Sequence, residues 1–492
     1  MKRKSMTAAL LLLASLLTAA SVTACGGDTE TPAGNDGTAA DTTAAVTAGE
    51  DASAYKYAEI DCGGEEFHIL NTNTTWGFYT TIYHEETTGD ILDDTIFEAN
   101  SKVEEAFNVK LKVTEVEITQ TANEYSKTIL SGDDVYQTAL MSAGRSSSVM
   151  LESYVLDLSE IPEMQLNQPW WDQQVKEYSH LGGSDRVFFG ISDINLMNFE
   201  VIEGVYVNDD MLKNLDLPLL YDSVRDGTWT LSKMHEYMKA AVNLNGDTDW
   251  TFSLEGNAVY GLTFWEQTTP ALMYGCGLDY VKLDKDGIPH LNVENEHFYN
   301  VTAKIAEMFK TKGETVYLNQ STKGLHYEDA FKDGRSLFTL AQLKGSTKFR
   351  DMEDTYGILP APKYDEAQDR YYSFCTSNIV ASTIPVTCAD PHRAAAIVDA
   401  MAYHAYADVL PVYYGVNVEQ KQMRNEDSIE MLGIIGDTRA INIGSIYGWT
   451  SDLDTAIYQK LSKGDSAIAS VITAHTPKVE KLFEDTLALF TE

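Results

Sequence analysis

The sequence predicts an α/β protein with a helix-rich C-terminal end. Segments such as Glu66–Leu70 and Val109–Val113 alternate apolar and polar residues, which is the pattern of short strands with one buried face. Apolar residues at helical spacing separate them, and later segments carry amphipathic helices with recognisable caps. The chain of 492 residues is 44% hydrophobic, which is enough for a large core and predicts two domains.

The N-terminus has the pattern of a secretory leader. Lys2, Arg3 and Lys4 precede the apolar stretch Ala8–Ala20, which is shorter than the ~20 residues that cross a bilayer as a helix. Residues 22–25 read VTAC, which resembles the lipobox of bacterial lipoproteins. The resemblance implies a signal peptide over 1–24 and a lipid on Cys25; the alternative is an ordinary leader with an incidental cysteine.

By this resemblance, we expect residues 25–58 to be a lipidated cysteine followed by a flexible tether. This segment is rich in Gly, Ala, Thr and Asp, and it holds too few large apolar groups to offset the entropy of ordering a chain. A coil of ~30 residues has an end-to-end distance of roughly 30 Å. The body of the protein therefore begins near residue 59, and we expect the membrane to hold it only through the lipid anchor.

The body opens with a β-α-β pattern. The strand at Glu66–Leu70 leads through a polar, aromatic loop to a helix whose apolar residues run from Ile96 to Phe107, and Val109–Val113 follows. This order predicts the start of a mostly parallel sheet. Val135–Met141 reads as a further strand.

Caps mark three later helices. Thr230 precedes a helix with Leu231, Met234, Tyr237, Met238 and Ala241 on one face, as expected for an N-cap and a buried stripe. Asp390 before Pro391 predicts another helix start, and Thr476 before Pro477 predicts the start of the last helix.

Charge and cysteine content exclude several classes of function. The net charge is −38, and loss of the three basic leader residues lowers it to −41, which argues against nucleic acid or an anionic membrane surface as a partner. The scattered residues Cys62, Cys276, Cys375 and Cys388 have no CxxC spacing and make neither a metal site nor a disulfide framework. One pair among them could form a disulfide outside the cell.

Four phrases, in this order, resemble a known family: PWWD at 169–172, GTWTLSKM at 227–234, AFKDGRSLF at 330–338 and MEDTYGILPAPKYDEAQDRYYS at 352–373. They are similar to the extracellular solute-binding lipoproteins of bacterial ABC importers, close to the family 1 carbohydrate-binding group. The resemblance implies a two-lobed periplasmic-binding-protein-like fold of type II, with the ligand between lobes that close around a hinge.

The order of these phrases implies how the lobes share the chain. Lobe one would hold 59–194 and 337–381, and lobe two would hold 198–334 and 386–492. The chain would cross between lobes near Asp193–Asn198, Gly334–Ser336 and Ser382–Pro385.

No catalytic signature stands out in the sequence. It has no GxSxG, HExxH or Walker motif, and the glycines around Tyr274–Gly277 lack the pattern of a dinucleotide fingerprint. A carboxylate pair of a glycosidase could hide among 74 acidic residues, so a secreted glycan-cleaving enzyme stays an alternative. The loop Asn243–Asp249 resembles a calcium loop but departs from it at the first ligand, the turn glycine and the closing glutamate, which favours a polar surface loop. We expect neither a metal nor a cofactor.

Aromatic residues and polar strand ends supply the candidate ligand site. An aromatic ring suits the C–H face of a sugar, and polar side chains suit its hydroxyl rim. Because ligands of open α/β folds gather at the carboxyl ends of strands, the polar candidates are Ser142 and Arg145, after the third strand, and Asp193 and Asn195, at the first crossing. The aromatic candidates are Trp76, in the loop after the first strand, Trp265, Tyr447 and above all Trp449, because sugar-binding relatives supply a stacking ring from this region.

Together these observations predict a monomeric, membrane-tethered solute receptor. It would capture a small solute, a sugar or oligosaccharide, and deliver it to the permease subunits of an ABC importer. A receptor that feeds a sensor rather than an importer is the other alternative that the sequence leaves open.

Overall fold

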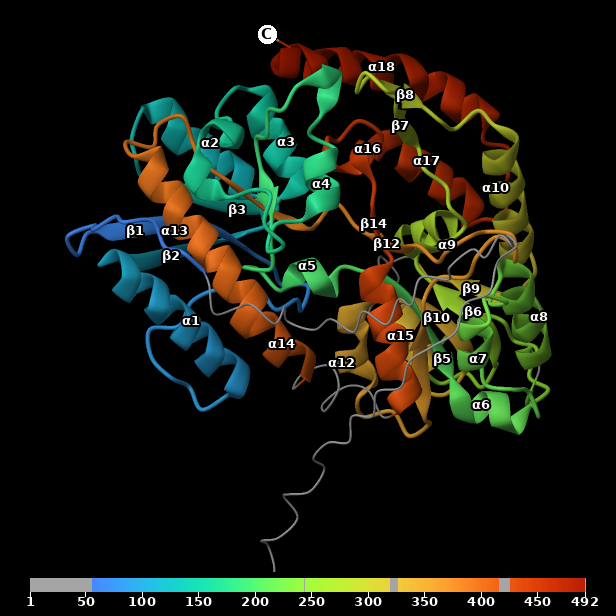
Figure 1. Ribbon diagram of the computed structural model, residues 1–492. Helices are drawn as coiled ribbons and strands as arrows, with labels where there is room; N and C mark the ends of the chain where they lie inside the picture. Colours follow the sequence, from blue (N-terminus) through green and yellow to red (C-terminus); the bar gives the residue numbers. More distant parts are fainter. Residues whose placement is uncertain (1–54, 243, 319–325, 416–424, 492) are drawn as a thin grey trace, which may run out of the picture. The chain divides into compact units, whose positions relative to one another are not determined.

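The computed structural model describes residues 55–242, 244–318, 326–415 and 425–491 (Figure 1). The predicted leader, Cys25 and most of the predicted tether lie outside these residues. Strands and helices alternate through most of the described chain, and no described helix combines the length and apolarity that a membrane span requires.

The first sheet has the strand order β2-β1-β3-β13-β4. Its strands are β1 (Glu66–Asn73), β2 (Lys110–Glu117), β3 (Thr138–Ser142), β4 (Gly190–Ile191) and β13 (Val380–Thr383). β1 runs parallel to β2 and β3, but β13 runs antiparallel to both β3 and β4. The three predicted strands are therefore present, and the sheet is mixed rather than mostly parallel because a strand from far along the chain inserts into it.

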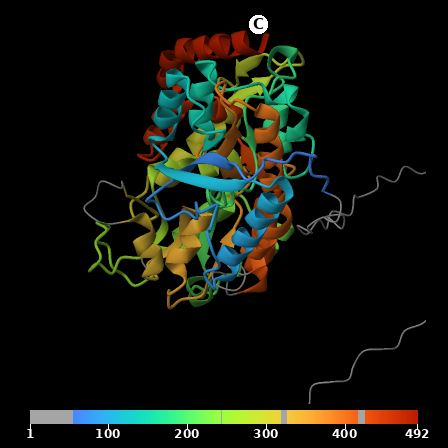
Figure 2. The same cartoon turned by 90° about the vertical axis from the view of Figure 1, so that its left-hand side faces the viewer.

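Four helices pack around this sheet: α1 (Ile91–Phe107), α2 (Thr121–Ser131), α3 (Ala143–Leu151) and α13 (Pro391–His404). α1 and α13 lie side by side although almost three hundred residues separate them (Figures 1 and 2). The side chain of Asp90 caps α1 and that of Asp390 caps α13, each satisfying main-chain N–H groups that have no partner within the helix. The predicted Asp390-Pro391 helix start is confirmed.

The second sheet has the strand order β11-β5-β10-β6-β9. Its strands are β5 (Glu203–Asn208), β6 (Tyr260–Phe264), β9 (Thr315–Tyr317), β10 (Ser336–Gln342) and β11 (Tyr356–Leu359). β6 runs parallel to β9 and β10, and β5 runs antiparallel to β10 and β11. Within the segment 337–381 predicted for lobe one, β10 and β11 pair in this second sheet, β10 with β5 and β6 and β11 with β5; the lobe boundaries stay a prediction.

Around the second sheet the chain forms α6 (Asp209–Asn214), α7 (Tyr221–Arg225), α8 (Leu231–Ala241), α9 (Thr269–Gly275), α10 (Glu296–Phe309), α11 (Tyr327–Lys332), α12 (Ser346–Phe349) and α15 (Glu426–Asp437). α8 and α11 pack on β6 and β10. The hydroxyl of Thr230 accepts a hydrogen bond from the N–H of Lys233, and all five residues predicted for the buried face of α8 are buried. This local prediction is confirmed in full.

The chain changes sheets between β4 and β5, in a segment that contains α5 (Met197–Glu200). This segment includes the expected crossing at 193–198. The side chain of Asn198 donates to the main-chain oxygens of Ser192 (2.7 Å) and Val380 (2.9 Å). No change of sheet occurs at 334–336; the chain returns to the first sheet only between β11 and β13.

Two further pairs of strands are short. β12 (Ser373–Cys375) runs parallel to β14 (Arg439–Ile441), and β7 (Val281–Leu283) pairs antiparallel with β8 (Pro289–Leu291). The C-terminal end is rich in helix, as predicted. It contains α14 (Leu410–Val412), α16 (Ile443–Ile446), α17 (Ser451–Leu461) and α18 (Ala469–Thr491), while α4 (Gln173–Glu177) lies earlier in the chain.

The predicted start of the last helix is wrong. α18 begins at Ala469 and continues through Pro477, although an interior proline removes one helical hydrogen bond and costs ~3 kcal/mol. Ile472, Val479, Phe483 and Phe490 are all buried on α18. Because one buried face continues across the proline, packing offsets its cost.

The four cysteines after residue 54 are buried free thiols. Burial raises the pKa of the Cys375 thiol to about 12 and that of Cys388 to about 11, so both are protonated and unreactive at neutral pH.

Candidate functional site

Polar residues collect at one edge of the first sheet. β3 runs parallel to β1, and β4 runs in the same direction because both β3 and β4 are antiparallel to β13. The carboxyl ends of β1, β3 and β4 therefore share an edge, where Asn73, Ser142 and Ile191 end their strands. The predicted residues Trp76, Arg145 and Asp193 all follow this edge, which is the expected place for a ligand in such a fold.

Trp76 lies in the loop after β1, and 44% of its surface is exposed. The loop is held by its backbone and by polar side chains. The side-chain oxygen of Asn73 accepts hydrogen bonds from the N–H of Thr74 (2.6 Å) and the hydroxyl of Thr80 (3.0 Å), and Trp76 donates its own main-chain N–H to the Thr74 hydroxyl (3.1 Å). A large aromatic side chain is thus presented at the strand edge on an ordered loop.

Ser142 and Arg145 lie where β3 turns into α3. Ser142 is buried and its hydroxyl accepts a hydrogen bond from the Arg145 guanidinium at 3.0 Å. Hydrogen bonds from Thr119 lower the pKa of Glu117, at the end of β2, and the charge of Arg145 lowers it further. The guanidinium of Arg145 donates no other hydrogen bond within the described chain, so its remaining donors can serve ligand oxygens.

Asp193 and Asn195 differ in what they can offer a ligand. Burial raises the pKa of Asp193, while the nearby positive charge of Arg439 lowers it. Asn195 is buried; its amide nitrogen donates to Asn71 (3.1 Å) and its oxygen accepts from the N–H of Met197 (3.1 Å). Asn195 therefore ties the connection between the sheets to β1, and Asp193 is the group with free acceptor capacity.

Trp265 follows β6 at the corresponding edge of the second sheet. The side chain is partly exposed, but its indole nitrogen is buried and has no hydrogen-bond partner in the structure. The hydroxyl of Thr269, four residues later, is also buried and unpaired. Each such group costs ~1–3 kcal/mol when left unsatisfied, so a ligand oxygen or a water at this position would be stabilised.

The helix α17 packs against the turn after β6 and against α9, and it brings Asp454 to this neighbourhood. One carboxylate oxygen of Asp454 accepts hydrogen bonds from Thr450 (3.0 Å) and Ser445 (3.3 Å); the other oxygen is buried without a partner. Burial raises the pKa of this carboxyl to about 7. Sequence reasoning missed Asp454 because an acidic residue in a first helical turn has the pattern of an ordinary solvated face.

The N-terminal part of α3 meets α16, so the two groups of residues are continuous. The hydroxyl of Ser147 donates to the main-chain oxygen of Ile446, and a Cβ built on Gly144 would lie 3.7 Å from the main-chain oxygen of Ser445. Since Ser445 also bonds Asp454, polar contacts run from the end of β3 to the helices at the end of β6. An alanine at 144 would therefore fit this junction in ordinary van der Waals contact.

Tyr447 and Trp449 lie inside the C-terminal helices. Trp449 is 2% exposed; its ring stacks on Tyr447 at 4.8 Å and meets the edge of Phe483 at 4.9 Å. The Tyr447 hydroxyl donates to the main-chain oxygen of Tyr178 (3.3 Å). These contacts are those of a packed core, so the role of Trp449 as a stacking platform stays a prediction that its packing does not favour.

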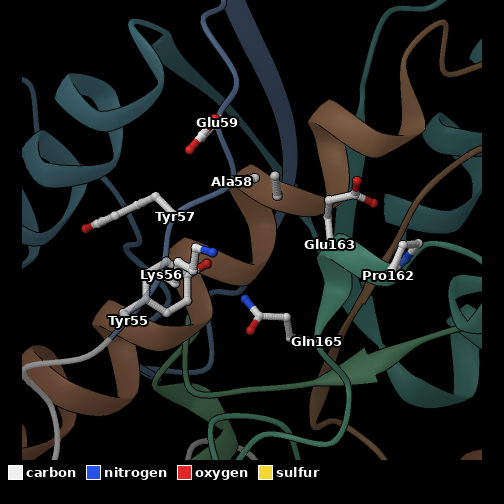
Figure 3. A pocket seen from close by; sticks show the side chains of 9 residues that line it. Tyr55, Lys56, Tyr57, Ala58, Glu59, Pro162, Glu163 and Gln165 are labelled. Atoms are coloured by element: carbon white, nitrogen blue, oxygen red, sulfur yellow. The ribbon is translucent and has the colours of Figure 1, made fainter.

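A pocket of about 390 Å³ lies elsewhere, where the chain enters the body (Figure 3). Residues 55–59 form one wall, and Pro162, Glu163 and Gln165 face them. Several of its polar groups have protein partners: Tyr55 and Gln165 bond the carboxylate of Asp399, and Glu163 bonds His392. Lys56 and Glu59 are exposed to solvent. Because no polar side-chain atom of these described residues is both buried and unpaired, the pocket offers a ligand less than the strand edges do.

The loop 243–249 resembles a calcium loop in sequence, and its first residue, Asn243, lies outside the described residues. Within 244–249 the carboxamide of Asn245 and the carboxylate of Asp247 accept hydrogen bonds from main-chain N–H groups two residues later. In the described chain no three His, Cys, Asp or Glu side chains converge in a way that could hold a metal ion.

Comparison with known proteins rests on the fold. No family model matches the sequence, and no curated protein matches it. Three similar solved structures are the ABC substrate-binding protein of Listeria monocytogenes in complex with cycloalternan (10% identity, 85% of this chain and 99% of that chain, TM-score 0.55), the GacH receptor of Streptomyces glaucescens, solved unliganded and with acarbose (12%, 86% and 99%, 0.53), and UgpB of Mycobacterium tuberculosis in complex with glycerophosphocholine (11%, 79% and 95%, 0.53).

At such low identity the likeness establishes the fold and not the ligand. The chain has the two-lobed α/β fold of these binding proteins, and the predicted fold class is confirmed. The first of these neighbours is described as an ABC substrate-binding protein and the second as a receptor.

Proposed function

We propose that this chain is a membrane-tethered solute-binding protein that captures a sugar or oligosaccharide and delivers it to the permease of an ABC importer. The fold, which it shares with binding proteins over 79–86% of its length, is the observation that carries the proposal. Two of these neighbours were solved with the saccharides cycloalternan and acarbose, which supports a saccharide as the ligand class.

The strand edges supply chemistry that suits such a ligand. We assign ligand contacts to Trp76, Ser142, Arg145, Asp193 and Trp265. An exposed indole ring suits the apolar face of a sugar, while a guanidinium, a carboxylate and an unpaired indole N–H suit its hydroxyls. Asn195, Tyr447 and Trp449 would support this site from the core, since the protein already satisfies their polar groups.

Capture by such a site is a shift between two arrangements of the lobes. A ligand that contacts residues of both sheets binds the closed arrangement better than the open one, and this difference in affinity drives closure. Scattering should therefore show a smaller radius of gyration when the ligand saturates the protein.

The tether would determine where in the cell the solute is captured. A lipid on Cys25 would hold the body at the outer face of the cell membrane, and the acidic residues would keep it away from anionic headgroups. In this position a captured solute is close to the permease, which copurification of the full chain with permease subunits would test. Copurification with a sensor kinase instead would favour the sensing role.

A ligand screen tests the proposal most directly. The full chain, purified in detergent, is heated with saccharides of increasing length, including maltotetraose and acarbose, and with glycerophosphocholine. Binding at a hundred times Kd stabilises a protein by about 2.7 kcal/mol, so a saccharide that binds should raise Tm. Stabilisation by glycerophosphocholine alone would contradict the sugar assignment, and conversion of a saccharide into products would favour the glycan-cleaving enzyme.

A further inference from the structure

Lys344 reaches from the second sheet to a loop of the first. It lies in the short turn Leu343–Gly345 directly after β10. Its ammonium nitrogen is 2.7 Å from the main-chain oxygen of Trp76 and 3.7 Å from the centre of the Phe78 ring. Both residues belong to the segment 74–82 after β1, called here the Trp76 loop. One cation therefore makes a hydrogen bond and a cation–π contact to that loop.

The connection between the sheets holds the same loop from another side. Glu200, in α5, is buried, and one of its oxygens accepts the main-chain N–H of Tyr79 at 2.6 Å. Its other oxygen accepts the hydroxyl of Tyr413 at 2.6 Å. Glu200 and Lys344 thus bond neighbouring parts of the loop backbone. Of these two residues, Lys344 lies beyond the connection, in the turn that follows β10 of the second sheet.

The pKa of the Lys344 amine lies below its ordinary value, chiefly because the amine is buried. Burial lowers its pKa, and the nearby charges of Glu328, Glu200 and Glu203 raise it. Lys348, the other lysine close by, pairs with Glu328 and does not contact the Trp76 loop in the described chain. An apolar side chain at 344 would therefore lose both the hydrogen bond to the main-chain oxygen of Trp76 and the cation–π contact to Phe78.

We propose that Lys344 is a positioning residue that couples the second sheet to the Trp76 loop. When the sheets lie as they do here, its ammonium fixes the backbone that carries the exposed Trp76 ring; when they separate, the loop loses this contact and becomes more mobile. The coupling rests on the proposed function only in assigning Trp76 to the ligand site. A single side chain, that of Lys344, would then link closure of the lobes to ordering of the loop that carries Trp76.

The test needs no ligand, so its failure is distinct from failure of the proposed function. Lys344→Met removes the charge and keeps the length, and Lys344→Arg keeps the charge. Lys127→Met serves as the control, since Lys127 is an exposed lysine on α2 that pairs only with Glu124. If Lys344→Met does not fold, Lys344→Gln replaces it.

Two measurements are made on the full chain in detergent. Hydrogen–deuterium exchange follows the amides of the Trp76 loop. Double electron–electron resonance measures the distance between spin labels at Leu130→Cys, on α2, and Leu254→Cys, before β6. Both leucines are exposed. The native thiols that the structure describes are buried and unreactive, so they should not take up the label. The control variant and the wild-type protein carry the same labels.

Lys344→Met should raise exchange in the Trp76 loop about tenfold, as expected for loss of a hydrogen bond from a charged donor, and should lengthen or broaden the label distances. Lys344→Arg and Lys127→Met should match the wild-type protein. Unchanged exchange would overturn the proposal, and so would faster exchange throughout the chain, which marks a merely structural role. A faster loop with unchanged label distances would also overturn it, because the coupling to the second sheet would be missing.

Discussion

The indole nitrogen of Trp449 donates a hydrogen bond of 2.8 Å to the hydroxyl of Thr486 on α18. The Thr486 hydroxyl in turn donates to the main-chain oxygen of Leu482 at 2.8 Å. With Tyr447 against one ring face and the edge of Phe483 close by, Trp449 joins the segment after α16 to the last helix. The ring that the sequence favoured as a ligand platform is therefore part of the packing of the C-terminal helices.

Truncation of this ring should cost folding stability. Trp449→Ala is expected to lower the free energy of unfolding by ~3–5 kcal/mol, as for other large buried side chains. Trp449→Phe keeps an aromatic ring and loses the bond to Thr486, so its cost should be nearer ~1–3 kcal/mol. Urea unfolding measures both. A stable Trp449→Ala protein with weakened sugar binding would instead restore the platform role.

Truncation of Trp76, in contrast, should weaken ligand binding and leave folding stability almost unchanged. Trp76 is 44% exposed, so Trp76→Ala should change the free energy of unfolding by less than ~1 kcal/mol. If the ring stacks on the ligand, affinity should fall by ~2 kcal/mol or more, roughly thirtyfold. Titration of the saccharide found in the screen measures this loss. Unchanged affinity in the folded variant would remove Trp76 from the site.

The carboxylate of Asp399 should make stability depend on pH. It lies in α13 and accepts hydrogen bonds from Tyr55 (2.9 Å), Gln165 (2.7 Å), Trp170 (2.9 Å) and Trp171 (2.8 Å). Burial nevertheless raises its pKa to about 6, although these bonds lower it. Since an unfolded aspartate has a pKa near 3.9, the folded protein binds the extra proton between about pH 4 and 6.

This carboxyl therefore favours folding most below about pH 4, and its contribution is lost as pH rises to about 6. Asp399→Asn should remove that part of the pH dependence from unfolding curves measured between pH 4 and 7. The variant should also be less stable at pH 7, because an amide offers one oxygen where four donors converge. An unchanged pH profile would show that Asp399 does not titrate in this window.

Pro477 should limit the stability of α18. Its ring nitrogen carries no hydrogen, so the carbonyl four residues earlier, on Thr473, lacks its helical donor. Pro477→Ala should restore the bond and raise the free energy of unfolding by ~1–3 kcal/mol. Thr476→Ala, the neighbouring control, removes a hydroxyl that donates to Ile472 at 2.9 Å and should bring no gain. Loss of stability in Pro477→Ala would mean that the helix needs the proline.

The anchor prediction concerns Cys25. Because a thioether-linked lipid needs the cysteine sulfur, Cys25→Ser should release the protein from the membrane fraction or leave an uncleaved precursor. Fractionation and the mass of the mature chain show which occurs. A processed Cys25→Ser protein that still sediments with membranes would contradict the lipoprotein assignment.

The sequence by itself determined the local structure. Thr230 and its buried stripe, the Asp390-Pro391 start of α13 and the strand at Glu66–Leu70 are all present, because caps and apolar periods depend on neighbours within a few residues. The same logic placed Ser142 and Arg145 at the end of the third predicted strand, and β3 does end at Ser142.

Only the tertiary structure decided which distant segments meet. Nothing in the sequence around β10 shows that its partners are β5 and β6, so the sequence could not connect Lys344 with Trp76. It could not tell the buried Trp449 from the exposed Trp76, and it predicted that the last helix begins at Pro477, whereas α18 begins at Ala469 and its buried face continues through this proline. Strand partners, covered aromatic faces and a tolerated proline all depend on contacts between residues far apart in the chain, and such contacts leave no periodicity in the sequence.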